Sequence, residues 1–270
     1  MEGLAELELV GGKDCKTVIK KLLVKPPLLI QKAMYLDQNN PGTAHIYIMS
    51  SACGILQDDK ITINIKASEN SNAFITTQSA TKIYKTEQKR SNQVINIFVE
   101  KNSFLEFLPK QIIPHKLAEF YQKVNIKIDP SSTLIYSENI SCGRIAYGEE
   151  FDFTSLIFRT NAVNEKEDIL FSDAINIEPS KRKYVFKNLF GKKKIFSTTY
   201  IISKVLDNEK LDYKINLILK NNKMFGGVSQ LPNNSGLIIR ILSDSIDEIE
   251  NNILEITDYI KKSYKIKIKN

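Results

Sequence analysis

Three stretches in the first half of the chain carry nearly the same apolar phrase. In each one, isoleucine or valine alternates with a mostly polar residue, and a polar turn and a second apolar run follow. The three phrases occupy residues 63–67, 95–99 and 124–128, and the runs after them occupy residues 73–77, 104–108 and 133–137. Side chains on a strand alternate between its two faces. Each phrase therefore predicts a strand that presents its isoleucines on one side and Asn or Lys on the other.

The spacing of the phrases, roughly thirty residues, falls in the range where periodicity indicates stacked supersecondary units. Two arrangements fit: three hairpins in an antiparallel meander, or a coil of stacked β-layers. In either one the polar positions can line up in rows from layer to layer. The sequence predicts a mostly β fold of stacked sheets with β-solenoid-like layering.

Other segments complete the predicted elements. Further strands are expected at residues 43–49, 156–159, 169–171 and 200–205, and at 211–217, where Leu, Tyr, Ile and Leu alternate strictly with polar residues. Ser245 and Glu248 form a capping-box pattern, and isoleucines then step by three and four along one helical face. We expect one domain over residues 1–270, with a β body at about 17–242 and a helix at about 245–262. This helix either packs on the body or docks on another protein.

Composition limits the possible functions. The chain has 38 Lys and Arg against 31 Asp and Glu, a net charge of +7, with basic clusters at 181–183, 192–194 and 261–269. A basic β-rich nucleic-acid-binding protein is therefore the alternative function. The cysteines Cys15, Cys53 and Cys142 lie far apart, which indicates a reducing compartment. With no leader pattern and no apolar run of about twenty residues, we expect a soluble, cytoplasmic protein with no membrane partner.

The sequence shows little catalytic chemistry. His45 and His115 are the two histidines, and His45 lies within an apolar strand, where a hydrogen-bonded structural histidine is expected. Neither G-x-S-x-G nor H-E-x-x-H occurs. Residues 191–194 lack the upstream glycine and the Ser or Thr of a phosphate loop and predict a basic turn. We expect a protein that is not an enzyme.

Several phrases between the strands resemble one known family when taken in order. They occupy residues 41–47, 54–59, 76–84, 105–109, 113–114, 143–153 and 229–242. The ordered set resembles the urease accessory protein UreD family (UreH in some systems) from about Pro26 to the end of the last helix. Departures from the family's pattern fall at Cys53-Gly54, Asp58-Asp59, Lys110 and His115. They bear on individual metal contacts more than on the family.

The resemblance implies a mostly β fold with a carboxy-terminal helix and a non-enzymatic role. UreD-like proteins bind apo-urease and act with a helical partner, UreF, and a GTPase, UreG, while nickel enters the urease site. The family is thought to carry Ni²⁺ through an internal passage. The resemblance thus implies Ni²⁺ in transit, no permanently bound cofactor and no nucleic-acid partner.

A carrier must release its ion, so its path should use carboxylates and hydroxyls rather than the Cys and His sets that bind divalent ions tightly. Acids and hydroxyls at the predicted strand ends are the candidates for a transient nickel path, although each is also typical of a solvated turn. The candidates are Asp58, Asp59, Thr76, Thr77, Ser79, Glu138 and Glu149.

Two arginines are candidates for partner contacts, Arg144 and Arg240. Arginine can hold a carboxylate by two parallel hydrogen bonds. Arg144 lies between Gly143 and Gly148, where glycines let the backbone bend. It binds either a partner or, as an internal clamp, Glu149.

Overall fold

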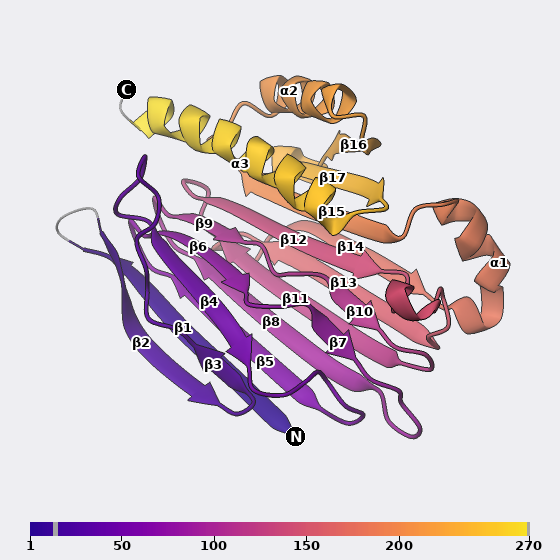
Figure 1. The fold of residues 1–270 in the computed structure, drawn as a ribbon. Coiled ribbons are helices and arrows are strands. Elements are labelled where there is room, and N and C mark those ends of the chain that lie inside the picture. The colour runs from indigo at the N-terminus through magenta and orange to yellow at the C-terminus, as the bar shows by residue number, and fades with distance from the viewer. Residues whose placement is uncertain (13–15, 269–270) are drawn as a thin grey trace.

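Two β-sheets face each other in the computed structural model, and helices cover the outer side of one of them (Figure 1). The structure describes residues 1–12 and 16–268, so Cys15 and Lys269 lie outside the described residues. The strands of the seven-stranded sheet, in spatial order, are β14 (Ile169–Ile177), β13 (Ser155–Val163), β11 (Glu119–Ile128), β8 (Ser91–Val99), β5 (Lys60–Ala67), β1 (Glu2–Gly11) and β2 (Thr17–Lys25).

The second sheet has ten strands within the described residues. Its main path runs through β16 (Phe225–Gln230), β17 (Gly236–Ser243), β15 (Ile195–Ser203), β12 (Thr133–Ser141), β9 (Phe104–Phe107), β6 (Asn72–Thr77), β4 (Ala44–Ser50) and β3 (Leu28–Ile30), with β7 (Thr81–Ile83) and β10 (Ile112–Pro114) beside it. The helices are α1 (Pro179–Phe190), α2 (Asn208–Asn221) and α3 (Ile246–Ile268).

The repeated phrases stack as consecutive layers of a coil. Strands β5, β8 and β11 are parallel neighbours, with Ile63 opposite Ile95 and Ile95 opposite Val124. Between them the chain crosses to the other sheet and forms β6 and β9, which are also parallel neighbours. The solenoid-like layering is confirmed, and parallel pairing excludes the antiparallel meander.

Asparagines form a ladder on the outer face of the seven-stranded sheet. Asn96 Nδ2 donates to Asn64 Oδ1 at 2.8 Å, and Asn125 Nδ2 donates to Asn96 Oδ1 at 2.8 Å. The isoleucine or valine residues on either side of each asparagine face inward and are buried. The predicted polar row therefore exists on this face, and it joins the layers side chain to side chain.

The apolar residues form two cores. The larger one lies between the sheets, and the smaller one lies between the outer face of the ten-stranded sheet and the helices α2 and α3 (Figure 1). The expected packing of α3 on the β body is confirmed. Two ion pairs add to it: Lys261 Nζ lies 2.6 Å from Glu106 Oε1, and Lys110 Nζ lies 2.6 Å from Glu250 Oε2.

The start of α3 keeps half of the predicted capping box. The Glu248 amide donates to Ser245 Oγ at 3.4 Å, as the pattern predicts. The Glu248 carboxylate instead accepts from Ser243 Oγ at 2.6 Å, and Ser243 Oγ accepts from the Ser245 amide at 3.2 Å. The helix continues to Ile268, beyond the predicted end at 262. Lys261 lies within it and pairs with Glu106.

The predicted strand at residues 211–217 is wrong, because these residues lie in α2. The side chain of Asp207 accepts from the Lys210 amide and caps the helix. Leu211, Ile215, Ile218 and Leu219 are the buried apolar residues, and their spacing follows the helical period. Tyr213, which the alternation placed beside Ile215, is 74% exposed. The seven-residue window was too short to separate the two periods.

The elements that were not predicted include β1, α1 and β16. Strand β1 extends the β body to Glu2, because Ala5, Leu7 and Leu9 alternate with Glu6 and Glu8 and are buried. Helix α1 leaves most of its residues exposed, so it lacks a strong apolar stripe. Strand β16 is a largely exposed edge strand with two glycines, which weaken its strand signal.

Alanine substitutions in α2 test its helical assignment. Ile215→Ala should lower the free energy of unfolding by about 2–5 kcal/mol, because the side chain is fully buried. Tyr213→Ala, the matched control, should change it by less than about 0.5 kcal/mol. Urea denaturation followed by circular dichroism measures both values, and equal losses in the two variants would contradict the helix.

Candidate functional site

The carboxylate of Glu138, in β12, lies between the two sheets. Its side chain is buried, and its Oε1 atom accepts from Gln122 Nε2 at 2.8 Å and from the Tyr136 hydroxyl at 3.0 Å. It also accepts from Thr160 Oγ1 at 3.3 Å. Gln122 and Thr160 belong to the opposite sheet, so Glu138 connects the two sheets through polar contacts in an otherwise apolar core.

The second oxygen of Glu138 has no hydrogen-bond partner among the described residues. Burial, the largest effect, raises the pKa of Glu138 to about 7, although the hydrogen bonds from its three donors oppose this rise. Near neutral pH the carboxyl group is therefore divided between its protonated and ionised forms. A nearby cation would favour the ionised form.

A cavity of about 390 Å³ lies between the sheets beside β5 and β6, and Glu138 is not part of its lining. Three of the predicted path residues, Asp59, Thr77 and Ser79, line it together with Cys53 and Gln93. The structure thus brings together residues from β5, β6 and the loops beside them. Most of the remaining lining is apolar, so the oxygen groups are few and convergent, as in ligand-binding cavities generally.

Two glutamines lead from this cavity toward Glu138. Gln93 of β8 lines the cavity and lies opposite Gln122 of β11 in the parallel ladder. Gln122 in turn donates to Glu138. The sequence analysis missed both glutamines, although a signal exists. Each occupies the inward phase of a strand whose other inward residues are mostly apolar.

Asp59 has a structural role at the edge of the cavity. Its Oδ1 atom accepts from the Met1 amino group at 2.8 Å, and its Oδ2 atom accepts from the Leu56 amide at 2.8 Å. The hydrogen bond to Asp59 is the largest cause that raises the pKa of the Met1 amino group. Both oxygens of Asp59 are therefore engaged before any ion approaches.

Two predicted acidic path residues lie outside the cavity lining and the Glu138 cluster. Asp58 is exposed on a turn, where its φ is 61° and Lys89 Nζ lies 3.7 Å from its Oδ2 atom. Glu149 accepts two hydrogen bonds from Arg144, one of them from Nε at 2.8 Å. Arg144 thus forms the internal clamp. Gly143 is required there, because a Cβ atom would lie 2.4 Å from the Glu149 carbonyl oxygen.

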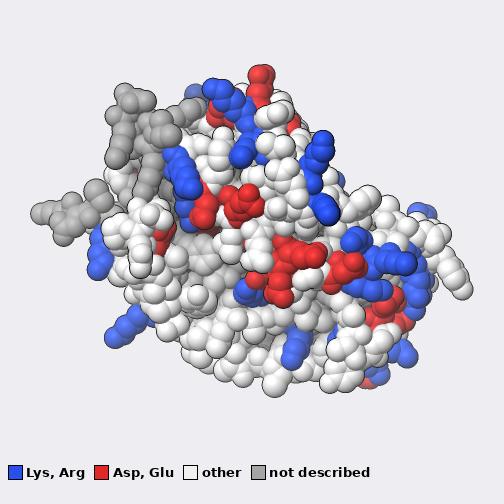
Figure 2. Space-filling model, turned by 45° about the horizontal axis from the view of Figure 1, so that its top comes forward, with Lys and Arg blue, Asp and Glu red and all other residues white. Residues whose placement is uncertain are grey.

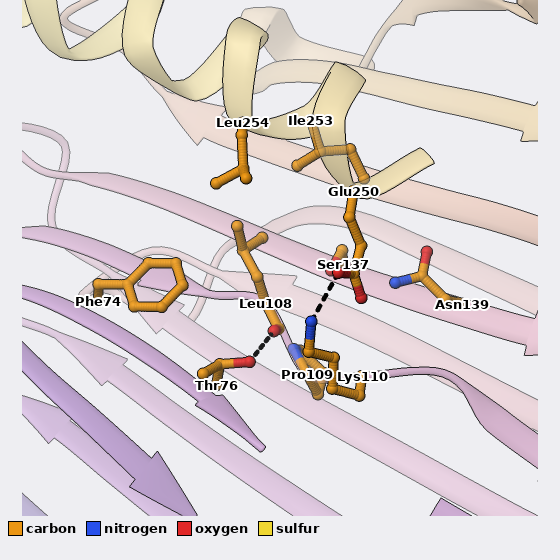
Figure 3. Close-up of a pocket in the computed structure, with 10 residues that line it drawn as sticks. All are labelled: Phe74, Thr76, Leu108, Pro109, Lys110, Ser137, Asn139, Glu250, Ile253 and Leu254. Atoms are coloured by element: carbon orange, nitrogen blue, oxygen red, sulfur yellow. Dashed lines mark hydrogen bonds and ion pairs between the residues drawn. The ribbon is translucent and has the colours of Figure 1, made fainter. Parts of the chain in front are cut away.

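Thr76 faces α3 instead of the cavity between the sheets. Figure 3 shows it in a small pocket of about 80 Å³ between the ten-stranded sheet and α3, where Lys110 reaches Glu250 across the seam. Its hydroxyl donates to the Leu108 carbonyl at 2.6 Å. Because neighbouring residues on a strand alternate in direction, Thr76 and Thr77 belong to different sites.

The histidines do not join the Glu138 cluster. The ring of His45 packs against Phe74, with centroids 5.2 Å apart, and its Nε2 atom has no hydrogen-bond partner among the described residues. Packing and main-chain hydrogen bonds to Met34 hold this residue, and the expected side-chain hydrogen bond does not occur within residues 1–12 and 16–268. His115 packs against Tyr84 beside the Arg144 clamp.

Charge on the surface is mixed. On the face shown in Figure 2, Asp and Glu interrupt the described Lys and Arg residues, so a continuous basic stripe does not form on that face. This arrangement does not favour the nucleic-acid alternative. Among the described residues, no helix is both long and apolar enough to span a membrane. Nor do three His, Cys, Asp or Glu side chains within residues 1–12 and 16–268 gather as a metal-binding group.

The fold and the interior define a layered β protein whose core carries a few convergent oxygen groups. The sequence model of the UreD urease accessory protein family matches residues 2–266. The chain is 29% identical over 235 residues to the urease accessory protein UreD of Cenarchaeum symbiosum, across 87% of this chain and 82% of that one. It is 32% identical over 230 residues to urease accessory protein UreD 2 of Brucella canis, across 84% and 76%.

A more distant relative is urease accessory protein UreD 2 of Streptomyces griseus, which is 26% identical over 237 residues, across 87% of this chain and 80% of that one. The chain belongs to the UreD urease accessory protein family. The resemblance found in the ordered phrases is confirmed.

The pKa of Glu138 predicts a pH-dependent stability. The folded-state pKa of about 7 lies above the unfolded value of 4.5, so ionisation costs stability as the pH rises between these values. The full cost is about 3 kcal/mol. Glu138→Gln should remove this dependence. Its free energy of unfolding should therefore rise relative to that of the parent as the pH is raised from 5 to 8. Urea denaturation at both pH values measures the change, and parallel pH profiles would contradict it.

Proposed function

We propose that this chain is a non-enzymatic urease maturation factor that binds apo-urease and acts with UreF and the GTPase UreG. In this proposal Ni²⁺ is the cargo and passes through the interior between the two sheets. Membership of the urease accessory protein family supports the maturation role. The observation that carries the passage is Glu138, a buried carboxylate between the sheets with one unpartnered oxygen.

The proposed path begins in the cavity lined by Asp59, Thr77 and Ser79. From there the path passes Gln93 and reaches Gln122, which lies opposite Gln93 on the neighbouring strand. It ends at Glu138, which accepts a hydrogen bond from Gln122. Amide, hydroxyl and carboxylate oxygens can replace part of the hydration shell of a divalent ion. They hold nickel less firmly than imidazole or thiolate sets do.

Weak ligation suits a carrier. At association rates of about 10⁵–10⁷ M⁻¹s⁻¹, a site with micromolar affinity releases its ion within roughly 0.1–10 s, and a nanomolar site takes about a thousand times longer. A single buried carboxylate with neutral oxygen neighbours belongs to the weaker class. The path can therefore deliver an ion on the time scale of enzyme maturation.

An activation assay with purified components tests the maturation role. Apo-urease supplied with nickel, GTP, UreF and UreG should reach far less activity when this chain is omitted. Equal activation without the chain would disprove the role. Co-purification of apo-urease with this chain provides an independent measurement of binding.

A substitution at Glu138 tests the path itself. Glu138→Gln should leave the complex assembled but lower the initial rate of urease activation by about tenfold, because the neutral amide no longer attracts the cation. Glu106→Gln is the matched control, since Glu106 is equally buried but faces α3 on the other side of the sheet. Activation at the parental rate in Glu138→Gln would show that the path does not use this carboxylate.

A further inference from the structure

One end of the molecule carries exposed apolar side chains on two neighbouring segments. The first segment is helix α1, and the second is the loop at residues 143–151, which follows β12 (Figure 1). The most exposed large side chains of these segments are Tyr184 at 84%, Tyr147 at 77% and Leu189 at 66%. Neither segment contributes to the cavity lining beside β5 and β6 or to the Glu138 cluster.

Helix α1 has apolar side chains on two faces. Phe186 and Phe190 are one turn apart and pack against Phe151, with ring centroids 6.2 and 4.9 Å from that of Phe151. Val185 and Leu189 are also one turn apart, but they lie on another face and are 56% and 66% exposed. A helix with apolar side chains on several faces is normally covered on each of them. No described residue covers this second face of α1.

The loop beside α1 is held in one conformation. Arg144 donates two hydrogen bonds to Glu149, and its guanidinium lies 4.8 Å from the centroid of the Tyr147 ring. Phe151 is 4% exposed and has a φ of 56°, which is rare for a bulky residue. Such a backbone persists only where the surroundings stabilise it, and the packing of Phe151 on α1 does so. Tyr147 is thus presented to solvent on a rigid support.

Uncompensated positive charge borders the exposed apolar side chains. Lys183 of α1 pairs with Asp152, which follows the loop, and this contact ties the two segments together. Three other cations in or directly after α1 form no ion pair with a described residue. They are Arg182, Lys187 and Lys192. The basic clusters at residues 181–183 and 192–194 therefore leave positive charge for an external acidic group.

An open pocket of about 440 Å³ continues this surface toward the interior cavity. Its lining includes Arg144, Ile145 and Tyr147 from the loop, together with His115 and Lys82. Lys82 of β7 also lines the cavity in which the proposed nickel path begins. A protein that docks on the loop and α1 would therefore lie beside that cavity.

We propose that α1 and the loop at residues 143–151 form a docking surface for a protein that presents an apolar groove bordered by carboxylates. The inference rests on the proposed maturation role and adds the place where one protein partner binds. Tyr147 and Tyr184 suit this use, because tyrosine is enriched among the side chains that contribute most to protein interfaces. The unpaired cations supply charge complementarity, which speeds association and makes it dependent on salt.

A protein groove fits these features better than a lipid or nucleic-acid surface does. Helix α1 has 12 residues and is interrupted at Arg182, where φ is −148° and ψ is 41°, so it is not the regular amphipathic helix that lies on a membrane. Three unpaired cations allow few phosphate contacts. A clamped loop that fixes one tyrosine lowers the entropic cost of binding a partner of fixed shape.

The two arginines that were predicted as partner contacts differ in their relation to this surface. Arg144 is held by Glu149 and supports Tyr147, so it acts through the loop. Arg240 of β17 donates to both carboxylate oxygens of Asp173, at 2.9 and 2.7 Å, and joins β17 to β14 across the two sheets. It lies outside α1 and the loop, and the proposed surface does not use it.

Binding to purified UreF, UreG and apo-urease, each measured separately by biolayer interferometry, tests the surface. Tyr147→Ala/Tyr184→Ala should weaken binding to one of these proteins by at least about tenfold, because two exposed anchors are removed. Tyr213→Ala is the matched control, since Tyr213 is a 74% exposed tyrosine on α2. It should bind with the parental affinity. Circular dichroism and thermal melting verify that each variant is folded.

A charge variant tests the complementarity. Arg182→Gln/Lys187→Gln/Lys192→Gln should slow association with the same protein and reduce the dependence of the association rate on salt. The control variant removes three exposed lysines elsewhere on the chain and should associate at the parental rate. Its substitutions are Lys25→Gln, Lys32→Gln and Lys220→Gln.

Three outcomes would overturn the proposal. The first is parental affinity of folded Tyr147→Ala/Tyr184→Ala for all three proteins, and the second is a parent chain that binds none of them. The third is binding of the parent to phosphatidylserine vesicles or to a DNA duplex that the same double variant loses. Each result concerns the docking surface, because the maturation role is judged separately by urease activation with and without the chain.

Discussion

Parallel, in-register stacking of the Ile-Asn-Ile layers is the constraint on which the rest of the structure depends. Each layer contributes one strand to each sheet, so the two sheets grow together and enclose a common interior. Inward isoleucines fill most of that interior, and a polar residue in the inward phase is brought beside its equivalents in the next layer. Gln93 and Gln122 meet in this way.

A carboxylate is tolerated in this interior because the opposite sheet supplies its donors. Transfer of an isolated charge into an apolar core is strongly unfavourable unless it is paired or neutralised. Glu138 is partly neutralised, since its pKa of about 7 allows protonation near physiological pH, and Gln122 and Thr160 stabilise the ionised form. The residue can therefore lose its proton near neutral pH when a cation approaches, as the proposed path requires.

The sequence contains enough information for the layering, for α3 and for the family, because those signals are periodic or extend over long phrases. It misleads at residues 211–217, where a strand period and a helix period coincide over seven residues.

The site is harder to predict because its members come from distant strands. Glu138 and Thr160 belong to different sheets, and they meet only after both sheets have formed. Asp59, by contrast, was predicted as a candidate path residue, but its contact with Met1 depends on β1, which was not predicted.

The ends of the coil have a consequence for how the molecule behaves in solution. A stack of parallel layers exposes unpaired strand edges at its two ends, and such edges can recruit further strands from other molecules. Here the seven-stranded sheet ends in antiparallel pairs, β1 with β2 on one side and β13 with β14 on the other. The reversed direction interrupts the parallel layer repeat at both ends of this sheet. The antiparallel outer strands thereby end the repeat within a single chain.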